Sequence, residues 1–450
     1  MNLLIHKDAD FAQKVDLLVH RRTVEGGGEE TAVREIVEAV RREGDAALLR
    51  CTRQFDHVDW AAADLEVKAE EIEAAYRAVG EKEVAALKTA AENIRKFHSR
   101  QRQDSWEYEE GGARLGQIIR PLEVVGVYVP GGKAAYPSSV LMNAVPAVVA
   151  GVSTIVMCSP ARHGETSPHA LVAADLAGVS RIFKVGGAQA VAAMAYGTAT
   201  VPGVDKIVGP GNIYVALAKR LVFGRVDIDM IAGPSEILVL ADDSARPEFV
   251  AADLLSQAEH DEAAAPLLVT PSEALARATL KALDRQRRRL KRQAIIEVSL
   301  RDQCRLVVTA SMDAAVDLAN RIAPEQLELA VAEPRAILPR IKNAGAVFLG
   351  HYTPEAIGDY LAGPNHVLPT SGTARFSSPL GVYDFIKRIS LIEYSREALR
   401  AQAETCRTLA LMEHLDAHAE AVNIRLENRL GHSGQPGWDQ PGKPLTDGGQ

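Results

Sequence analysis

The sequence predicts an α/β protein with two related modules built on parallel sheets. From about residue 122 to 377, short apolar runs typical of strands alternate with helical segments, which is the pattern of strand–helix–strand units. Many of these runs end in a turn that contains glycine or proline, as in "VVGVYVPGG" and "KIVGPGN". A chain of 450 residues with 47% hydrophobic residues can form two or three domains with sizeable cores.

The elements follow in order along the chain. "MNLLIHKDADFAQKVDLLVHRR" indicates an amphipathic helix and lacks the features of a secretory signal, and residues 26–110 are helical and charge-rich. Residues 384–428 are expected to be mostly helical, and the last twenty residues, rich in Gly, Pro, Gln and Asp, are expected to be disordered. The expected strands between them are "VVGVYV", "TIVMC", "IFKV", "KIV", "ILVLA", "LLVT", "RLVV" and "AGAVFL".

Residues 140–160 are apolar over a length that could span a membrane. Pro137 begins a helix, Gly151 ends it, and the β-branched residues 154–156 then indicate a buried strand. A helix followed by a strand is the better interpretation, so no membrane partner is expected.

Charge and cysteine content narrow the class of partner. The net charge of −8 argues against nucleic acid, because a phosphate backbone selects for a basic surface, and favours a small molecule. Cys51, Cys158, Cys304 and Cys406 are far apart, which indicates neither a disulfide framework nor a thiolate zinc site. A reducing, cytoplasmic location fits.

Two glycine loops, residues 186–189 and 209–212, each stand between a strand and a helix. Free backbone N–H groups and the helix dipole can hold a phosphate at such a position. The dinucleotide fingerprint GxGxxG is absent, and tight turns alone also explain the glycines.

A mixed set of polar side chains suggests a metal site. Gln257 and His260 are three residues apart, which would put both on one face of a helix. Nitrogen and oxygen ligands without cysteine suit zinc and tolerate manganese or cobalt, although a lone helical histidine more often has no metal role. Spacing alone does not show that the distant candidates converge, and these are Asp359, His366, Glu413 and His418.

Taken together, the ordered motifs resemble the histidinol dehydrogenase family over about residues 25–428. The motifs are "VGVYVPGG", "VGGAQA", "VGPGN", "IAGPSEIL", "SQAEHD", "GDYLAGPNHVLPTSGTARFSS", "GVYDFIKRIS" and "DAH". The resemblance implies two incomplete Rossmann-like modules with parallel sheets, plus small N-terminal and C-terminal helical pieces. The implied parts are an N-terminal helical piece (1–25), a first α/β domain with the metal site (26–122 with 235–377), a second, NAD-binding α/β domain (123–234), a C-terminal helical domain exchanged in a dimer (378–430) and a disordered tail (431–450).

The resemblance also implies a function. It is the NAD-dependent, four-electron oxidation of L-histidinol to L-histidine through L-histidinal, the last step of histidine biosynthesis, by a cytoplasmic homodimer whose active site is shared between subunits. The implied zinc ligands are Gln257, His260, Asp359 and His418, one ion per site, and the NAD contacts are Tyr128, Gln189 and Asn212. The substrate contacts are Ser235, Glu325, His366 and Glu413 together with the four metal ligands.

Glu325 and Gln326 fall on the catalytic positions, and here the sequence departs from the family pattern. Glu325 is expected to activate the hydrating water, while the next residue, normally a histidine that looks like the general base, is Gln326. An amide cannot accept a proton, and a missing general base typically costs ~10²–10⁴ in rate. A second departure is His414, where the family more usually has glycine.

The departure at Gln326 leaves several interpretations open. The chain is a working histidinol dehydrogenase that moves the proton through Glu325, water or His366, a paralogue that oxidises another amino alcohol, or a slowed or non-catalytic homologue. A nucleotide-binding or metal-binding protein of the same fold without catalysis is the competing class.

Overall fold

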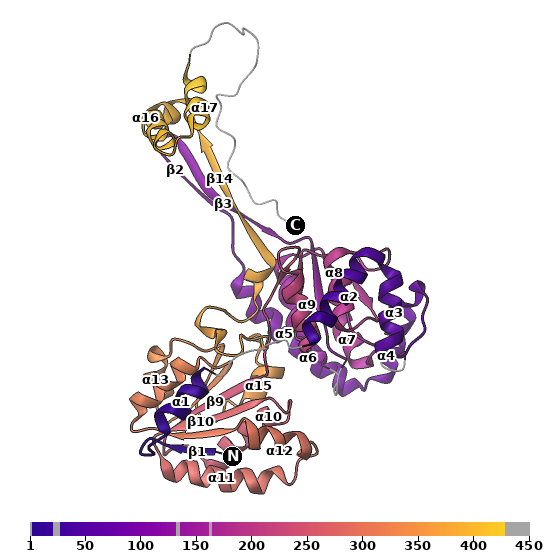
Figure 1. The fold of residues 1–450 in the computed structure, drawn as a ribbon, viewed down its shortest axis with the longest axis vertical. Helices are drawn as coiled ribbons and strands as arrows, with labels where there is room; N and C mark the ends of the chain where they lie inside the picture. Colours follow the sequence, from indigo (N-terminus) through magenta and orange to yellow (C-terminus); the bar gives the residue numbers. More distant parts are fainter. Residues whose placement is uncertain (1, 21–27, 132–135, 162–163, 428–450) are drawn as a thin grey trace. The chain divides into compact units, whose positions relative to one another are not determined.

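The computed structural model describes residues 2–20, 28–131, 136–161 and 164–427. The chain divides into two compact units: unit 1 is Met1–Arg102 with Pro121–Ile386, and unit 2 is Gln103–Arg120 with Lys387–Gln450. Unit 1 holds a six-stranded and a five-stranded sheet with parallel pairing throughout, which confirms the predicted α/β class with parallel sheets (Figure 1). The predicted tail, 431–450, lies outside the described residues.

The six-stranded sheet has the order β1-β11-β10-β9-β12-β13. Its strands are β1 Asn2–Ile5, β9 Glu236–Ala241, β10 Ala265–Thr270, β11 Arg305–Val308, β12 Gln326–Ala330 and β13 Ala346–Leu349. Its helices are α1 Phe11–Val19, α10 Pro247–Ala258, α11 Glu273–Arg287, α12 Gln293–Asp302, α13 Met312–Ile322, α14 Pro334–Ile337 and α15 Glu355–Tyr360.

Helices cover both faces of this sheet, which is why its strands are almost continuously apolar. Along β9, Ile237 and Val239 share a core with α10, α11 and α12, whereas Leu238 and Leu240 share another with α1 and α13. Successive side chains of a strand point to opposite faces, so one strand serves two cores.

The five-stranded sheet has the order β6-β5-β4-β7-β8. Its strands are β4 Val124–Tyr128, β5 Thr154–Cys158, β6 Arg181–Phe183, β7 Lys206–Val208 and β8 Asp227–Ile228, and the helices between them are α6 Pro137–Ala150, α7 Pro168–Ala177, α8 Gly187–Tyr196 and α9 Ile213–Val222. The runs expected as strands from the sequence are confirmed in both sheets.

The N-terminal helices pack on the five-stranded sheet, so the predicted grouping of residues 26–122 with 235–377 is wrong. These helices are α2 Glu29–Glu43, α3 Asp45–Phe55, α4 Ala69–Ala78 and α5 Glu81–His98. Val33 and Val37 of α2 share a core with α8 and α9, and Ile94 of α5 shares the opposite core with α6. They extend the helical cover on both faces of this sheet, a role that strand and helix periodicity along the chain does not reveal.

The predicted N-terminal helix is only partly correct. Residues Asn2–Ile5 form strand β1, which pairs in parallel with β11 at the edge of the six-stranded sheet, and the helix begins at Phe11. Leu4 of this strand is buried, because it belongs to the core between the sheet and the helices α1 and α13.

The apolar stretch 140–160 resolves into the predicted helix and strand. Helix α6 ends where Gly151 adopts a left-handed conformation with φ of 93°, which glycine tolerates because it has no Cβ, and β5 follows. Among the described residues, no helix is both long enough and apolar enough to cross a bilayer. All four cysteines are free thiols.

Unit 2 contains a three-stranded sheet in the order β14-β3-β2 and two helices. Its elements are β2 Trp106–Glu110, β3 Ala113–Pro121, β14 Ile386–Tyr394, α16 Arg396–Met412 and α17 Asp416–Leu426. The segment 378–430 was expected to be a mostly helical domain. In the structure, β14 joins the hairpin of β2 and β3, whose turn residues Gly111 and Gly112 both have positive φ. This pairing links residues far apart in the sequence, so local helical periodicity does not predict it.

Single-turn 3₁₀ helices complete the described elements. They are η1 Ala62–Asp64, η2 Ser99–Gln101, η3 Leu338–Arg340, η4 Thr373–Arg375 and η5 Val382–Phe385.

His414 ends helix α16 in a conformation that favours glycine. Its φ is 58°, its backbone N–H donates to the Leu411 carbonyl at 3.0 Å, and the Leu415 N–H donates to the Ala410 carbonyl at 2.9 Å. These two bonds form the helix end that normally has glycine at this position.

Replacing His414 with glycine should therefore stabilise unit 2. The left-handed conformation costs an L-residue roughly 1–2 kcal/mol and glycine loses roughly 0.5–1 kcal/mol more entropy on folding, so we expect His414→Gly to gain about 0.5–1 kcal/mol in urea unfolding. His414→Ala keeps the Cβ atom and is the control. An equal gain from alanine would show that backbone strain is not the cause.

Candidate active site

A cavity of about 1250 Å³ in unit 1 collects most of the predicted site residues. From the five-stranded sheet, its lining includes Pro130 and Gly209, which follow the carboxyl ends of β4 and β7. From the six-stranded sheet it includes Ser235, Glu325 and Gln326, at the amino ends of β9 and β12. The carboxyl ends of parallel strands are the usual ligand-binding edge of such sheets, so the first group is placed as expected for a ligand.

Glu325 is a buried carboxyl group in the wall of this cavity. It is 5% exposed, and its Oε2 accepts a hydrogen bond from the Glu236 backbone N–H at 2.8 Å. Burial raises the pKa of Glu325 well above its usual value, and the nearby carboxyl groups of Glu236 and Asp359 raise it further. A carboxyl group with a raised pKa next to a cavity is suited to exchange protons near neutral pH.

Gln326 points its amide at two acids. Its Nε2 donates to Glu355 Oε1 at 2.8 Å, and the side chain also hydrogen-bonds to Asp359. The Gln326 Oε1 atom is buried without a hydrogen-bond partner, and the residue is 3% exposed.

More carboxyl groups lie behind this amide. Glu355 and Glu328 are 1% and 4% exposed, and the Glu355 backbone N–H donates to Glu328 Oε1 at 2.7 Å. Burial raises the pKa of both side chains well above the usual value, helped in Glu328 by the charge of Asp253 and in Glu355 by that of Asp359. Burial also raises the pKa of Asp253, to about 6. Such groups carry protons at pH values where an exposed carboxyl group has lost them.

Gln257 and His260 come together, though not through the predicted helical spacing. Helix α10 ends at Ala258, so His260 lies in the following turn, where its backbone N–H donates to the Gln257 carbonyl at 3.1 Å. The atoms Gln257 Nε2 and His260 Nδ1 are 3.3 Å apart. Gln257 is fully buried, and its Oε1 has no hydrogen-bond partner.

Asp359 and His366 lie on the same cavity wall as His260. Burial raises the pKa of Asp359 to about 6, opposed by the charge of His260 and by the hydrogen bond from Gln326. Burial lowers the pKa of His260, although Asp359 opposes this shift. His366 Nδ1 donates to the Asp359 backbone carbonyl at 2.9 Å, and burial lowers the pKa of His366 to about 4. His366 is therefore a neutral imidazole at pH 7, with Nε2 as an acceptor.

These side chains have donor atoms that suit a metal cation, but unit 1 alone does not supply a complete set of ligands. Gln257 has a buried amide oxygen without a partner and lies beside the His260 imidazole, and Asp359 lines the same cavity as His260. An amide oxygen, an imidazole and a carboxyl group are donors that zinc accepts. Across the described residues, however, no group of three or more His, Cys, Asp or Glu side chains is positioned to hold a metal. Unit 1 supplies two such residues, His260 and Asp359, in addition to Gln257.

The remaining two predicted residues, Glu413 and His418, belong to unit 2. Glu413 caps the end of α16 and His418 lies in the first turns of α17, and both are exposed. Neither lines the cavity in unit 1.

Of the three residues predicted to contact NAD, Asn212 lines the cavity and the other two do not. Asn212 Oδ1 accepts from the Val215 N–H at 3.2 Å and so caps helix α9. Tyr128 is 3% exposed and its hydroxyl accepts from the Gly187 N–H at 3.0 Å, while Gln189 is 2% exposed. The second glycine loop thus lines the cavity, and the first is packed beside Tyr128.

A buried ion pair fixes the loop that begins at Gly209. Its N–H donates to Asp229 Oδ2 at 2.7 Å, its carbonyl accepts from Lys219 Nζ at 3.0 Å, and Lys219 pairs with Asp229. Gly209 has φ of 111°, and a Cβ there would lie 2.1 Å from the Tyr128 carbonyl oxygen. Only glycine fits this close approach.

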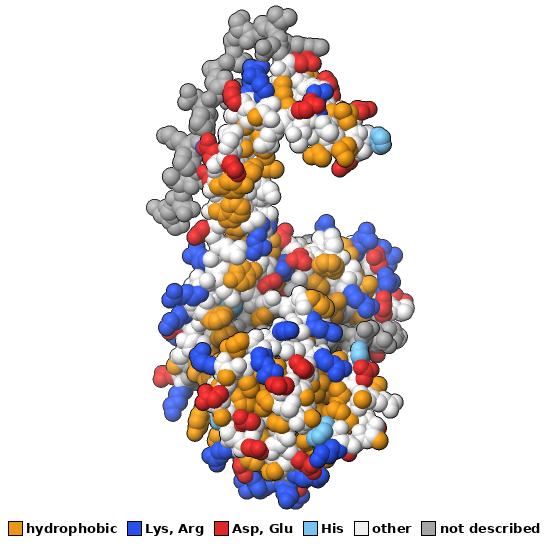
Figure 2. All heavy atoms as spheres, turned by 90° about the vertical axis from the view of Figure 1, so that its left-hand side faces the viewer, with side chains coloured by type: hydrophobic (Ala, Val, Ile, Leu, Met, Phe, Trp, Pro, Cys, Tyr) orange, Lys and Arg blue, Asp and Glu red, His pale blue; other side chains and the backbone are white. Residues whose placement is uncertain are grey.

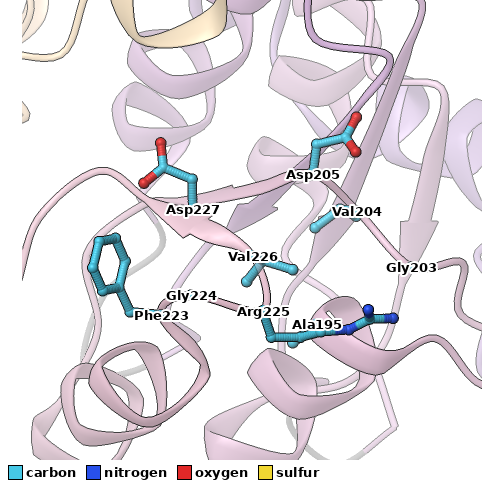
Figure 3. A pocket seen from close by; sticks show the side chains of 9 residues that line it. All are labelled: Ala195, Gly203, Val204, Asp205, Phe223, Gly224, Arg225, Val226 and Asp227. Atoms are coloured by element: carbon cyan, nitrogen blue, oxygen red, sulfur yellow. The ribbon is translucent and has the colours of Figure 1, made fainter. Parts of the chain in front are cut away.

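A second, smaller pocket of about 600 Å³ lies beside β8 (Figure 3). Its two acids serve the fold: Asp205 accepts from the Val124 N–H at 3.0 Å and Asp227 pairs with Lys206 at 2.8 Å. None of the predicted site residues lines it. The cavity with Glu325 is therefore the candidate active site.

Sequence reasoning missed the acids behind Gln326. Glu355 stands directly after a proline at the start of α15, which is an ordinary position for a solvated acid, and Glu328 alternates with leucines in β12. The one available signal was Glu328 itself, a charged residue inside a strand expected to be buried.

Comparison with known proteins identifies the family. The sequence model of histidinol dehydrogenase matches residues 19–426. The histidinol dehydrogenase of Syntrophotalea carbinolica is 57% identical over 429 residues, covering 95% of this chain and 100% of that protein, and that of Geobacter sulfurreducens is 54% identical with the same coverage.

A solved structure agrees with the sequence relatives. The crystal structure of histidinol dehydrogenase from Elizabethkingia anophelis superimposes with a TM-score of 0.90 at 38% identity, covering 95% of this chain and 98% of that one. The chain belongs to the histidinol dehydrogenase family, oxidoreductases of histidine biosynthesis.

Proposed function

We propose that the chain is a cytoplasmic enzyme that oxidises L-histidinol to L-histidine through L-histidinal, with NAD as the oxidant. Each of the two oxidations passes one hydride to one NAD and releases protons to the medium, and a water molecule adds to the aldehyde between them. The observation that carries the proposal is Glu325, a buried carboxyl group with a raised pKa in the wall of a cavity that also holds His260, Asp359 and His366.

Different residues would bind zinc and NAD. Gln257, His260 and Asp359 would hold zinc together with His418, and the ion would polarise and orient the substrate atoms bound to it. The loop of Gly209 and Asn212, with its clamped backbone, would hold part of NAD. Tyr128 and Gln189 are also proposed to take part in NAD binding. Both are buried, and neither lines the cavity.

Protons are handled by the residues of the wall. Glu325 accepts a proton from the hydrating water, because its raised pKa makes it a stronger base than an exposed glutamate. His366 Nε2 is a second acceptor, fixed by the bond from its Nδ1 to Asp359. Gln326 cannot titrate, so Glu325 carries the proton transfers that a histidine neighbour would share.

We also propose that two copies of the chain share each active site. The described part of unit 2 buries few hydrophobic side chains, and Figure 2 shows hydrophobic side chains gathered on its surface. Exposed apolar groups of this extent favour an interface, and a second copy is the partner that would bring Glu413 and His418 to the cavity of unit 1. The exposed side chains are Trp106, Tyr108, Ile389, Ile392, Tyr394, Leu409, Leu411, Met412, Leu415 and Ile424.

The stoichiometry of the reaction tests the function directly. Zinc-loaded protein should form two NADH per L-histidinol consumed, with histidine as the product, as four-electron oxidation requires. Gln326→His should alter the pH profile of turnover, since imidazole titrates near neutral pH. No NADH from the native protein would contradict the proposal, and a screen of other amino alcohols would then separate a paralogue from a non-catalytic homologue.

Glu325→Gln should lower activity and raise stability. We expect turnover to fall by ~10²–10⁴. A raised folded-state pKa means that wild type is most stable below the usual carboxyl pKa of 4.5 and loses stability as pH rises through the folded-state pKa. Urea unfolding should thus show no gain for the variant at pH 4 and a gain at pH 8. A gain independent of pH would contradict burial of an ionising carboxyl group.

Hybrid dimers test the shared metal site. His260→Asn and His418→Ala should each lose zinc and activity. Co-expression of the two variants should restore roughly a quarter of wild-type activity, because half of randomly formed dimers are hybrids and each hybrid has one intact site. Folded hybrid dimers without activity would show that His260 and His418 of different subunits do not form one site.

A further inference from the structure

The amide of Gln326 is a neutral link between a buried acid, Glu355, and a half-buried one, Asp359. Its Nε2 donates to Glu355 Oε1 at 2.8 Å, and the same side chain hydrogen-bonds to the Asp359 carboxyl group. An amide nitrogen has two N–H groups, so this one nitrogen can donate to both acids at once. The carbonyl oxygen of Gln326 is left buried and without a partner. The orientation of the amide is therefore set by the two carboxyl groups that face its nitrogen.

Glu355 is a rigid anchor for this amide. The side chain is 1% exposed, and its second oxygen is 3.4 Å from Ser256 Oγ, whose hydroxyl also donates to the Asp253 carbonyl at 2.7 Å. The backbone N–H of Glu355 donates to Glu328 Oε1 at 2.7 Å. The backbone of Glu355 is thus held by Glu328, which does not line the cavity, and its buried carboxyl group lies against Ser256, which does not line it either.

Asp359 is less firmly held than Glu355. It is half-buried, lines the cavity, and stands at the carboxyl end of the six-residue helix α15, which Glu355 begins. Its carboxyl group and His260 line the same cavity. Without a second contact, this short side chain could turn toward the cavity or toward the protein interior.

We propose that Gln326 is a positioning residue for Asp359, anchored by Glu355. The glutamine holds the Asp359 carboxyl group beside His260 and Gln257, where the proposed function requires a ligand of the cation. This inference rests on that function and assigns Gln326 a task that needs no proton transfer. Histidine could not perform it in the same way, because each of its ring nitrogens carries at most one N–H.

The affinity of the metal-free protein for zinc measures the positioning of Asp359 without relying on turnover. Positioning contacts of metal ligands typically change metal affinity by 10–100-fold. We expect Gln326→Leu and Glu355→Leu each to weaken zinc binding by ~10–100-fold, and the double variant to be no weaker than the weaker single one, because the two act as one unit. Glu355→Gln is the matched control. Its carbonyl oxygen can still accept from Gln326, so its zinc affinity should stay within about threefold of wild type.

The outcomes separate this inference from the proposed function. Unchanged zinc affinity in Gln326→Leu, or additive losses in the double variant, would overturn the positioning role. If wild type binds no zinc, the metal part of the proposed function fails, and thermal unfolding of Gln326→Leu, Asp359→Asn and their double variant decides instead. Non-additive shifts in Tm would then support the bridge, and additive shifts would overturn it.

Discussion

The candidate active site depends on one constraint: carboxyl groups crowded into a dry volume cannot all be ionised. Asp253, Glu325, Glu328, Glu355 and Asp359 all lie behind or along one wall of the cavity, and burial raises the pKa of each. Charges of the same sign at close range strengthen this effect. Protons are therefore shared among the acids, and neutral donors become the natural partners between them. The amide of Gln326 meets that need without adding charge.

The two sheets bring this acid wall to a ligand. The six-stranded sheet contributes the amino ends of β9 and β12, with Glu325 and Gln326, whereas the five-stranded sheet contributes the carboxyl ends of β4 and β7. The first side supplies titratable groups and the second supplies a glycine loop fixed by Lys219 and Asp229. Under the proposed function, proton chemistry and cofactor binding would belong to different modules of the same unit.

Most strands could be predicted from the sequence because the information is local, whereas the candidate site residues were expected from the family resemblance. Strands buried on both faces appear as short apolar runs, and polar residues directly beside them, such as Ser235 and Glu325, fall at sheet ends. The packing partner of helices α2–α5 could not be predicted, since an amphipathic helix does not specify which sheet covers its apolar face. The same limit applies to β14, whose partner β3 lies far away in the sequence.

The sequence indicated many residues of the candidate site but not how they are arranged in space. His260 was expected on a helix but lies in the turn after it, and Glu355 was not expected at all. Both outcomes come from tertiary contacts. The turn after α10 brings a histidine back to Gln257, and the start of α15 packs its acid under β12, where an exposed position is otherwise usual.

Strand β1 has a consequence for the order of folding. It is synthesised before the other described strands, yet its partner β11 follows about 300 residues later. The five-stranded sheet is complete in sequence by Ile228, so that module can close while β1 is still an unpaired edge. Closing so long a loop makes the six-stranded sheet the slower of the two to form. In the interval the exposed apolar strand is a surface for chaperones or for misassembly between chains.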